Sequence, residues 1–93
     1  MSQAIHQKQL DMALDLSLMA FSSEDSALKV NSVSEEYKLV EQHALTNFGI
    51  RDAFPLKQKL TVRGEKTFDT LYLDLPDGSV REYWFDISEF YGR

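Results

Sequence analysis

The chain has 93 residues, of which 43% are hydrophobic and 27% are charged, and its formal net charge is -5. This length and composition predict a single small domain over residues 1–93. The negative charge disfavours general binding to nucleic acids or anionic membranes, and no nucleic-acid-binding motif is present. Because cysteine is absent, disulfides, thiolate catalysis and thiolate metal sites are excluded.

No apolar run in the sequence is typical of a signal peptide or a membrane span. The most apolar stretch near the N-terminus, residues 10–21, is interrupted by Asp11 and Asp15. We therefore expect a cytoplasmic protein.

The first expected element is a helix that Ser2 can cap and that runs to about Ala20. Its apolar side chains form a wide stripe, which predicts packing against more than one element; the central members are Ile5, Met12, Leu16 and Met19. Residues 22–26 are rich in serine and acidic side chains, which favours a connecting loop, with room for one helical turn over residues 24–29.

A second helix is expected over residues 33–48. Ser32 and Glu35 have the spacing of a capping box, in which each side chain bonds the other's backbone amide. Gly49 and Ile50 match a Schellman ending. The expected apolar stripe contains Val33, Tyr37, Val40, Ala44 and Phe48. His43 lies off this stripe, and we expect it on the surface rather than in a catalytic role.

Residues 57–63 alternate with a period of two, which predicts a strand with one solvated face. The surrounding segment, residues 51–66, is the one positively charged part of the chain, at +3, with Arg51, Lys57, Lys59, Arg63 and Lys66 against Asp52 and Glu65. Two interpretations are open. The lysines protect an edge strand from pairing with other chains, or they form an anion site.

Two further strands are expected over residues 67–75 and 79–87, joined by a turn at Pro76-Asp77-Gly78. This turn places Leu71 opposite Tyr83 and Phe68 opposite Asp86. The expected fold is α+β in the order α-α-β-β-β, with two N-terminal helices packed on one face of a three-stranded antiparallel meander.

A hairpin packed on one face should carry apolar side chains on that face and polar ones on the other. Here both faces carry apolar side chains. One face carries the expected core: Leu71, Leu73, Leu75, Tyr83, Phe85 and Ile87. The other face mixes aromatic and acidic side chains, and we take five of them as candidate partner-binding residues: Phe68, Tyr72, Trp84, Glu82 and Asp86. Either the C-terminal residues 89–93 or the loop around Phe54 covers this face, or it binds a partner protein or a second copy, with Trp84 as the anchor.

The sequence contains no nucleophile elbow, phosphate loop or calcium loop, and no metal or cofactor is expected. Asp69 and Asp86 lie on adjacent strands, but the expected register points them to opposite faces, which disfavours a catalytic pair. We expect Asp86 either to cap a terminal turn at Ser88–Tyr91 or to pair with Arg63 or Lys66.

These features favour a small cytoplasmic protein-binding or self-associating module without catalytic activity. The alternative is an acidic inhibitor of the immunity or phage type, which presents Asp74, Glu82, Asp86 and Glu89 to a basic cleft of a toxin or nucleic-acid enzyme. A third hypothesis is a small enzyme that uses His43 or Asp86.

Overall fold

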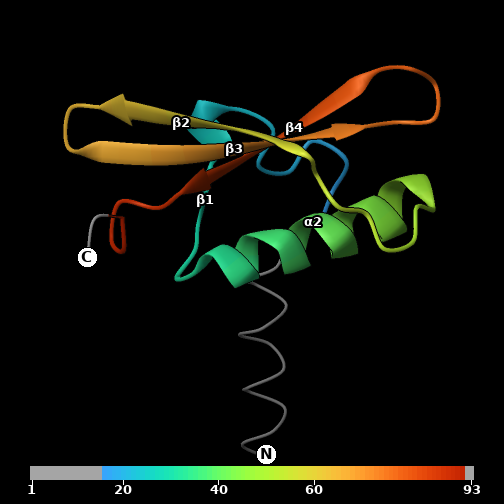
Figure 1. Ribbon diagram of the computed structural model, residues 1–93, viewed down its shortest axis with the longest axis horizontal. Coiled ribbons are helices and arrows are strands. Elements are labelled where there is room, and N and C mark those ends of the chain that lie inside the picture. Colours follow the sequence, from blue (N-terminus) through green and yellow to red (C-terminus); the bar gives the residue numbers. More distant parts are fainter. Residues whose placement is uncertain (1–15, 92–93) are drawn as a thin grey trace, which may run out of the picture.

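A computed structural model describes residues 16–91 of the chain. In chain order the elements are the 3-10 helix η1 (Glu24–Ser26), β1 (Leu28–Lys29), α2 (Val33–Phe48), β2 (Lys57–Arg63), β3 (Lys66–Asp74) and β4 (Val80–Asp86). The strands form one four-stranded sheet in the order β1-β4-β3-β2, shown in Figure 1. β1 runs parallel to β4, and the other neighbours are antiparallel.

The expected arrangement of two helices on a three-stranded antiparallel meander is therefore wrong. The described chain has one α-helix and a mixed sheet, because residues 28–29, expected in a loop or helical turn, pair with the edge of β4. Of the expected first helix, residues 1–15 lie outside the described residues. Residues 17–21 form a turn rather than helix, so the expected helix end near Ala20 is wrong.

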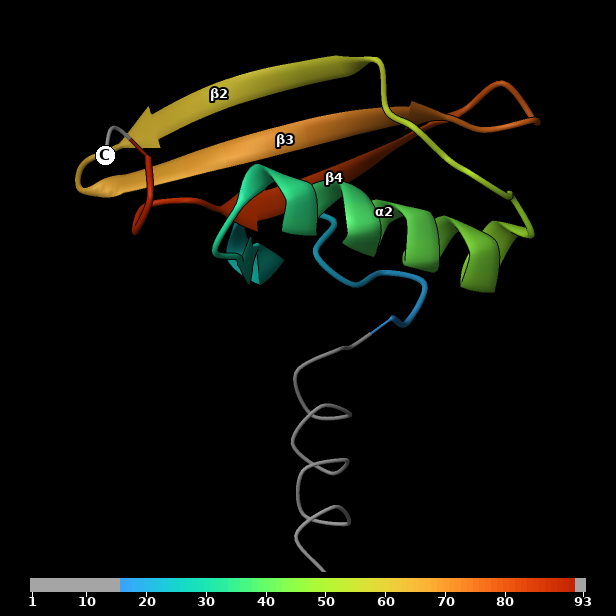
Figure 2. The same ribbon diagram turned by 60° about the horizontal axis from the view of Figure 1, so that its bottom comes forward.

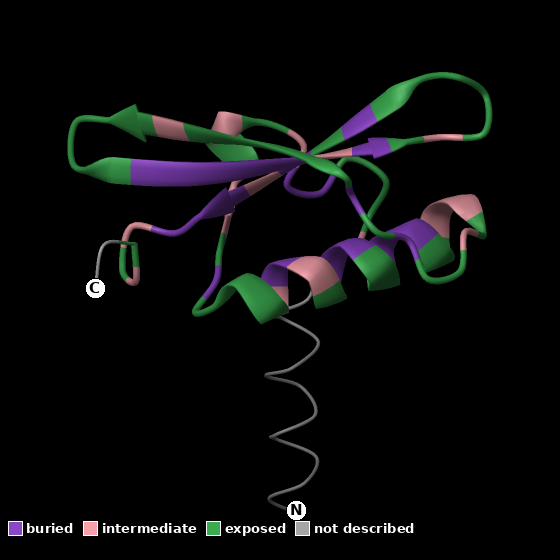
Figure 3. Cartoon of the chain, in the orientation of Figure 1, coloured by how far each residue is buried: buried purple, intermediate pink, exposed green. Residues whose placement is uncertain are grey.

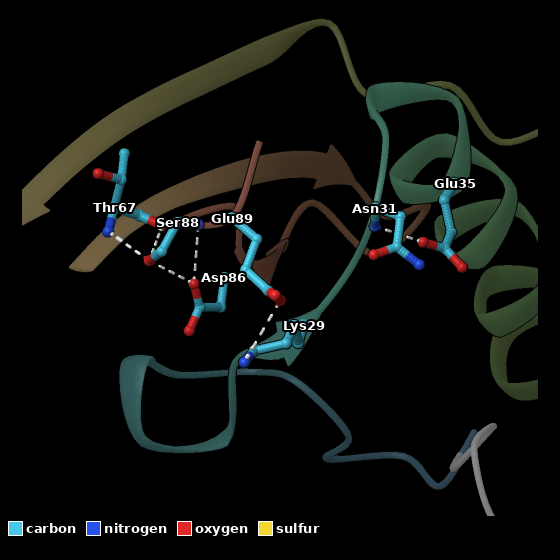
Figure 4. Close-up of polar contacts among 7 residues, drawn as sticks. All are labelled: Lys29, Asn31, Glu35, Thr67, Asp86, Ser88 and Glu89. Atoms are coloured by element: carbon cyan, nitrogen blue, oxygen red, sulfur yellow. Dashed lines mark hydrogen bonds and ion pairs between the residues drawn. The ribbon is translucent and has the colours of Figure 1, made fainter. Parts of the chain in front are cut away.

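The ends of α2 follow from local chemistry. The Glu35 N–H donates to Ser32 Oγ at 3.1 Å, as expected for an N-terminal cap. The Glu35 carboxylate accepts from the Asn31 N–H at 2.7 Å, so the second bond of the expected capping box goes one residue further back (Figure 4). The Ile50 N–H donates to the Ala44 carbonyl at 3.3 Å, and Gly49 has a φ of 68°, which confirms the Schellman ending.

Replacement of Gly49 by alanine is expected to lower the free energy of unfolding by about 1 kcal/mol, the usual cost of a left-handed residue that carries a Cβ. A Cβ at this position meets no atom within 4 Å, so the cost is conformational rather than steric. Urea denaturation of Gly49→Ala measures it. Ser34→Ala, at an exposed position inside α2, is the control; an unchanged midpoint for Gly49→Ala would contradict the assignment of this ending.

The hairpin of β3 and β4 has the expected register, with Leu71 opposite Tyr83 and Phe68 opposite Asp86. In the connecting turn, Asp77 accepts hydrogen bonds from the hydroxyl and the N–H of Ser79, and these bonds lower the pKa of its carboxyl. The hairpin is thus specified by its turn and by the alternation of its strands.

The core lies between α2 and the inner strands β3 and β4, and Figure 2 shows α2 lying along them. Phe21 enters this layer from the N-terminal side and packs against Tyr83 and Phe85, with ring centroids 5.6 and 5.4 Å away. The Trp84 N–H donates to the Phe21 carbonyl at 2.8 Å, which fixes this segment to β4. No residue of β2 belongs to the core, so α2 leaves this strand uncovered among the described residues.

Candidate functional site

The sheet face opposite α2, called here the outer face, carries the aromatic residues expected to bind a partner. Phe68 is only 3% exposed there, and its ring contacts that of Trp84 edge to face at 5.9 Å. Tyr72 and Trp84 are half-buried. The Arg63 side chain lies on the same face and its Nε is 2.9 Å from Glu24 Oε1, so η1 lies over this face. Phe68 is therefore inaccessible to a partner in this arrangement.

Phe90 and Phe54, the aromatic residues of the two segments expected to cover the outer face, do not lie on it. Phe90, in the C-terminal segment, packs against the core on the α2 side. Phe54 stacks on Tyr37 of α2, with ring centroids 5.0 Å apart. The cover comes from η1, in a segment whose loop-like sequence gave no signal for this contact.

Two acidic residues of the outer face, Glu82 and Asp86, have hydrogen-bond partners, whereas Asp74 on the same face is exposed and has none within residues 16–91. Glu82 is exposed and accepts from Trp84 Nε1 at 2.8 Å. Asp86 is buried and accepts from the Ser88 N–H at 3.0 Å and the Ser88 hydroxyl at 2.6 Å (Figure 4), which confirms the expected cap of the terminal turn. Burial opposes the ionisation of Asp86, but the bonds from Ser88 and the charges of Lys66 and Lys29 outweigh it and lower its pKa.

Asp86 also belongs to the contact that closes the end of the hairpin. The Thr67 N–H donates to Ser88 Oγ at 2.9 Å, so the hydroxyl links the start of β3 to the end of β4. Glu89 lies 3.7 Å from Lys29 Nζ in an ion pair. These contacts explain the acidic residues near the C-terminus as structural groups.

His43 is fully buried, so its expected surface position is wrong. Its Nε2 lies 2.9 Å from the Ser17 carbonyl and its Nδ1 lies 2.9 Å from the Tyr83 hydroxyl. A carbonyl oxygen only accepts, so Nε2 carries a proton and donates to the Ser17 carbonyl, while Nδ1 and the Tyr83 hydroxyl share the second hydrogen bond. Burial raises the pKa of Tyr83 to about 12, which keeps this hydroxyl protonated.

A buried carboxyl pair, which the sequence analysis missed, lies between α2 and β3. Glu36 is fully buried and Asp69 nearly so. No N–H or O–H group of residues 16–91 donates to either Glu36 oxygen, whereas Gln58 Nε2 donates to Asp69 Oδ1 at 3.2 Å. Burial, followed by the neighbouring Asp69 carboxyl, raises the pKa of Glu36 to about 9, so its carboxyl is protonated at neutral pH.

Three surface depressions of the described chain are lined by other residues than the buried polar groups. One depression lies beside Leu45 and Arg51, another beside Tyr37 and Phe54, and a third beside Leu18 and Val80. None of the three is lined by the carboxyl pair or by the histidine and tyrosine pair. Over residues 16–91, no group of three histidine, aspartate or glutamate side chains is arranged to hold a metal ion. No helix in the described part of the chain is long and apolar enough to cross a membrane.

β2 and the residue before it carry three of the exposed apolar side chains of the described chain; others, such as Met19 and Phe54, lie outside this strand. β2 is the edge strand of the sheet, which confirms that part of the sequence interpretation. Gln58 contacts Asp69, so its side of β2 faces the layer of α2. Leu60 and Val62 lie on that side and are 45% and 61% exposed, and the preceding Leu56 is 87% exposed. We call Leu56, Leu60 and Val62 the β2 apolar row.

The other side of β2 carries Lys57, Lys59 and Arg63, called here the β2 basic row. All three are exposed, so β2 has two solvated faces rather than the single one expected, as Figure 3 shows along nearly its whole length. Arg63 is paired with Glu24, whereas Lys57 and Lys59 have no ion pair within residues 16–91. The site that the described chain presents is therefore a two-sided edge strand, apolar on one face and basic on the other.

No protein-family model, curated protein or solved structure matches this chain.

Proposed function

We propose that this protein is a non-catalytic protein-binding module whose binding surface is the unpaired edge of β2. The observation that carries the proposal is the β2 apolar row, which stays exposed because α2 lies over β3 and β4. Natural proteins usually shield or shorten an exposed edge strand, since its free backbone groups can pair with another chain. A long edge with exposed apolar side chains is typical of a surface that binds.

A different protein is a better partner than a second copy of this chain. If two β2 strands paired antiparallel about Leu60, Lys57 of each copy would lie opposite Arg63 of the other. Like charges directly opposite each other destabilise a strand pair, and the basic rows of both copies would share one face. The basic row therefore favours a partner of opposite charge.

A binding role has more support than the other two hypotheses. None of the three depressions described above is lined by His43 or by the carboxyl pair, so these buried groups do not support the enzyme hypothesis. An acidic inhibitor would need several free carboxylates. Of the four that this hypothesis uses, Glu82, Asp86 and Glu89 already contact Trp84, Ser88 and Lys29, and only Asp74 has no contact within residues 16–91.

The proposed surface is tested with Leu60→Glu/Val62→Glu, which places two charges on the apolar row. The matched control is Leu18→Glu/Val80→Glu, because these residues are 54% and 53% exposed and lie away from β2. Each tagged protein is used to capture partners from cells of its source. A partner retained by the wild type and the control is then purified, and its binding is measured by calorimetry.

We expect the β2 variant to bind the purified partner about tenfold more weakly or worse, since two charged side chains would be buried at the contact. The control is expected to bind like the wild type. Equal binding by both double variants would contradict the proposal, as would a partner lost only on substitution of Tyr72 and Trp84.

A further inference from the structure

The chemistry of the partner can be read from the two faces of β2. Resting on the proposed function, we infer that the partner contributes an extended segment that alternates acidic and apolar residues and adds to β2 as a fifth strand.

The backbone of β2 can accept another strand. β2 is seven residues long, and β3 is its one strand neighbour within residues 16–91. On its other side the alternate N–H and C=O groups face away from the sheet. An extended segment gains affinity by pairing with such groups, and its side chains then lie alternately on the two faces of the enlarged sheet.

The apolar row selects the side chains on one face of that segment. Leu60 and Val62 are two residues apart, so both lie on the α2 side of the sheet. A partner strand places every second side chain beside them. Apolar side chains at those positions would bury surface that β2 now exposes to water.

The charge of the basic row selects the side chains on the other face. Lys57 and Lys59 are exposed and have no ion pair among the described residues, whereas Arg63 already has Glu24 beside it in an ion pair. Acidic partner residues are therefore favoured near Lys57 and Lys59, at the end of β2 away from the Arg63 ion pair. The same lysines disfavour pairing of β2 with a second copy of this chain. They therefore select an acidic partner and also protect the edge strand from self-association.

The test uses isotope-labelled full-length protein and three synthetic seven-residue peptides, followed by NMR titration. The first alternates glutamate with valine, the second alternates lysine with valine, and the third is the first with every amide N-methylated. We expect the glutamate peptide to shift the amide signals of residues 57–63. The lysine peptide is expected to bind about tenfold more weakly, because its charges repel the basic row. The methylated peptide is expected to lose binding, because it cannot donate to β2.

A charge reversal supplies the matched variant. Lys57→Glu/Lys59→Glu is expected to reverse the preference, so that the lysine peptide binds more tightly than the glutamate peptide. Lys38→Glu/Arg51→Glu changes the net charge equally at exposed positions outside β2 and is expected to leave the preference unchanged. The same reversal in both double variants would overturn the inference, because it would reflect net charge rather than β2.

The two proposals fail in different ways. Equal binding of the glutamate and lysine peptides, no binding by either, or retained binding of the methylated peptide overturns the acidic-strand inference. If capture of a protein partner still depends on Leu60 and Val62, the proposed function stands without the acidic-strand inference. Capture that does not depend on these residues overturns both.

Discussion

Glu36→Gln is expected to stabilise the protein at pH 8 and to remove most of the pH dependence that Glu36 causes. The pKa of Glu36 is raised from its ordinary value of 4.5 to about 9, first by burial and then by Asp69. Between these values the folded protein holds a proton that the unfolded chain releases. The free energy of unfolding therefore falls as the pH rises through this window, by up to about 1.4 kcal/mol per pH unit.

Urea denaturation at pH 5, 6.5 and 8 gives the free energy of unfolding of Glu36→Gln and of the wild type. The contributions of the other titrating groups cancel in the difference between the two proteins. We expect the variant to gain stability relative to the wild type as the pH rises, by about 2 to 4 kcal/mol between pH 5 and pH 8. Glu41→Gln, on the exposed side of α2, is the control and is expected to show no such trend. A difference that does not change with pH would contradict the assignment of a protonated Glu36.

Arg81→Met is expected to lower the free energy of unfolding by about 2 to 3 kcal/mol, the range for lost hydrogen bonds to a buried charged group. The Arg81 guanidinium donates to the carbonyls of Leu18 and Ala20 and lies 4.6 Å from the centre of the Tyr83 ring. Burial lowers the pKa of Arg81, against the opposing effect of Tyr83, so the carbonyls and the ring compensate a buried charge. Methionine keeps much of the volume and loses these bonds.

The comparison with Arg81→Lys separates charge from geometry. Lysine keeps the charge but lacks the planar fork that reaches two carbonyls, so an intermediate loss of stability is expected. Limited proteolysis provides a local readout, and cleavage within residues 17–22 is expected to be faster in Arg81→Met. Wild-type stability and unchanged cleavage in Arg81→Met would contradict the role of Arg81 in fixing this segment to β4.

The parts of the fold that were predicted correctly depend on short-range signals. The Pro76-Asp77-Gly78 turn set the hairpin register, and Ser32 and Gly49 marked the ends of α2. The parts that were predicted incorrectly depend on contacts between distant segments. β1 has two residues, too few for alternation to be visible, and it pairs with a strand more than fifty residues later in the chain.

The contrast between short-range signals and contacts of distant segments also explains which features of the candidate site were predicted. The buried face of α2 contains Glu36, Leu39, Val40, His43 and Ala44. Two of these residues are polar, so the apolar stripe expected from hydrophobicity is rotated by about one position from the face that is buried. Glu36 could have been suspected from its spacing to Leu39 and Val40. The burial of Phe68 could not, because η1, which lies over the outer face, is formed by a loop-like sequence far from β3 in the chain.

Hydrogen–deuterium exchange of the full-length protein, alone and with the purified partner identified by capture, tests most directly whether the β2 edge is the binding surface. The unpaired edge predicts fast exchange of outward β2 amides in the free protein, and marked slowing within residues 57–63 when the partner is added. Unchanged exchange in β2, with slowing instead in residues 24–26 of η1 over the outer face, would contradict it.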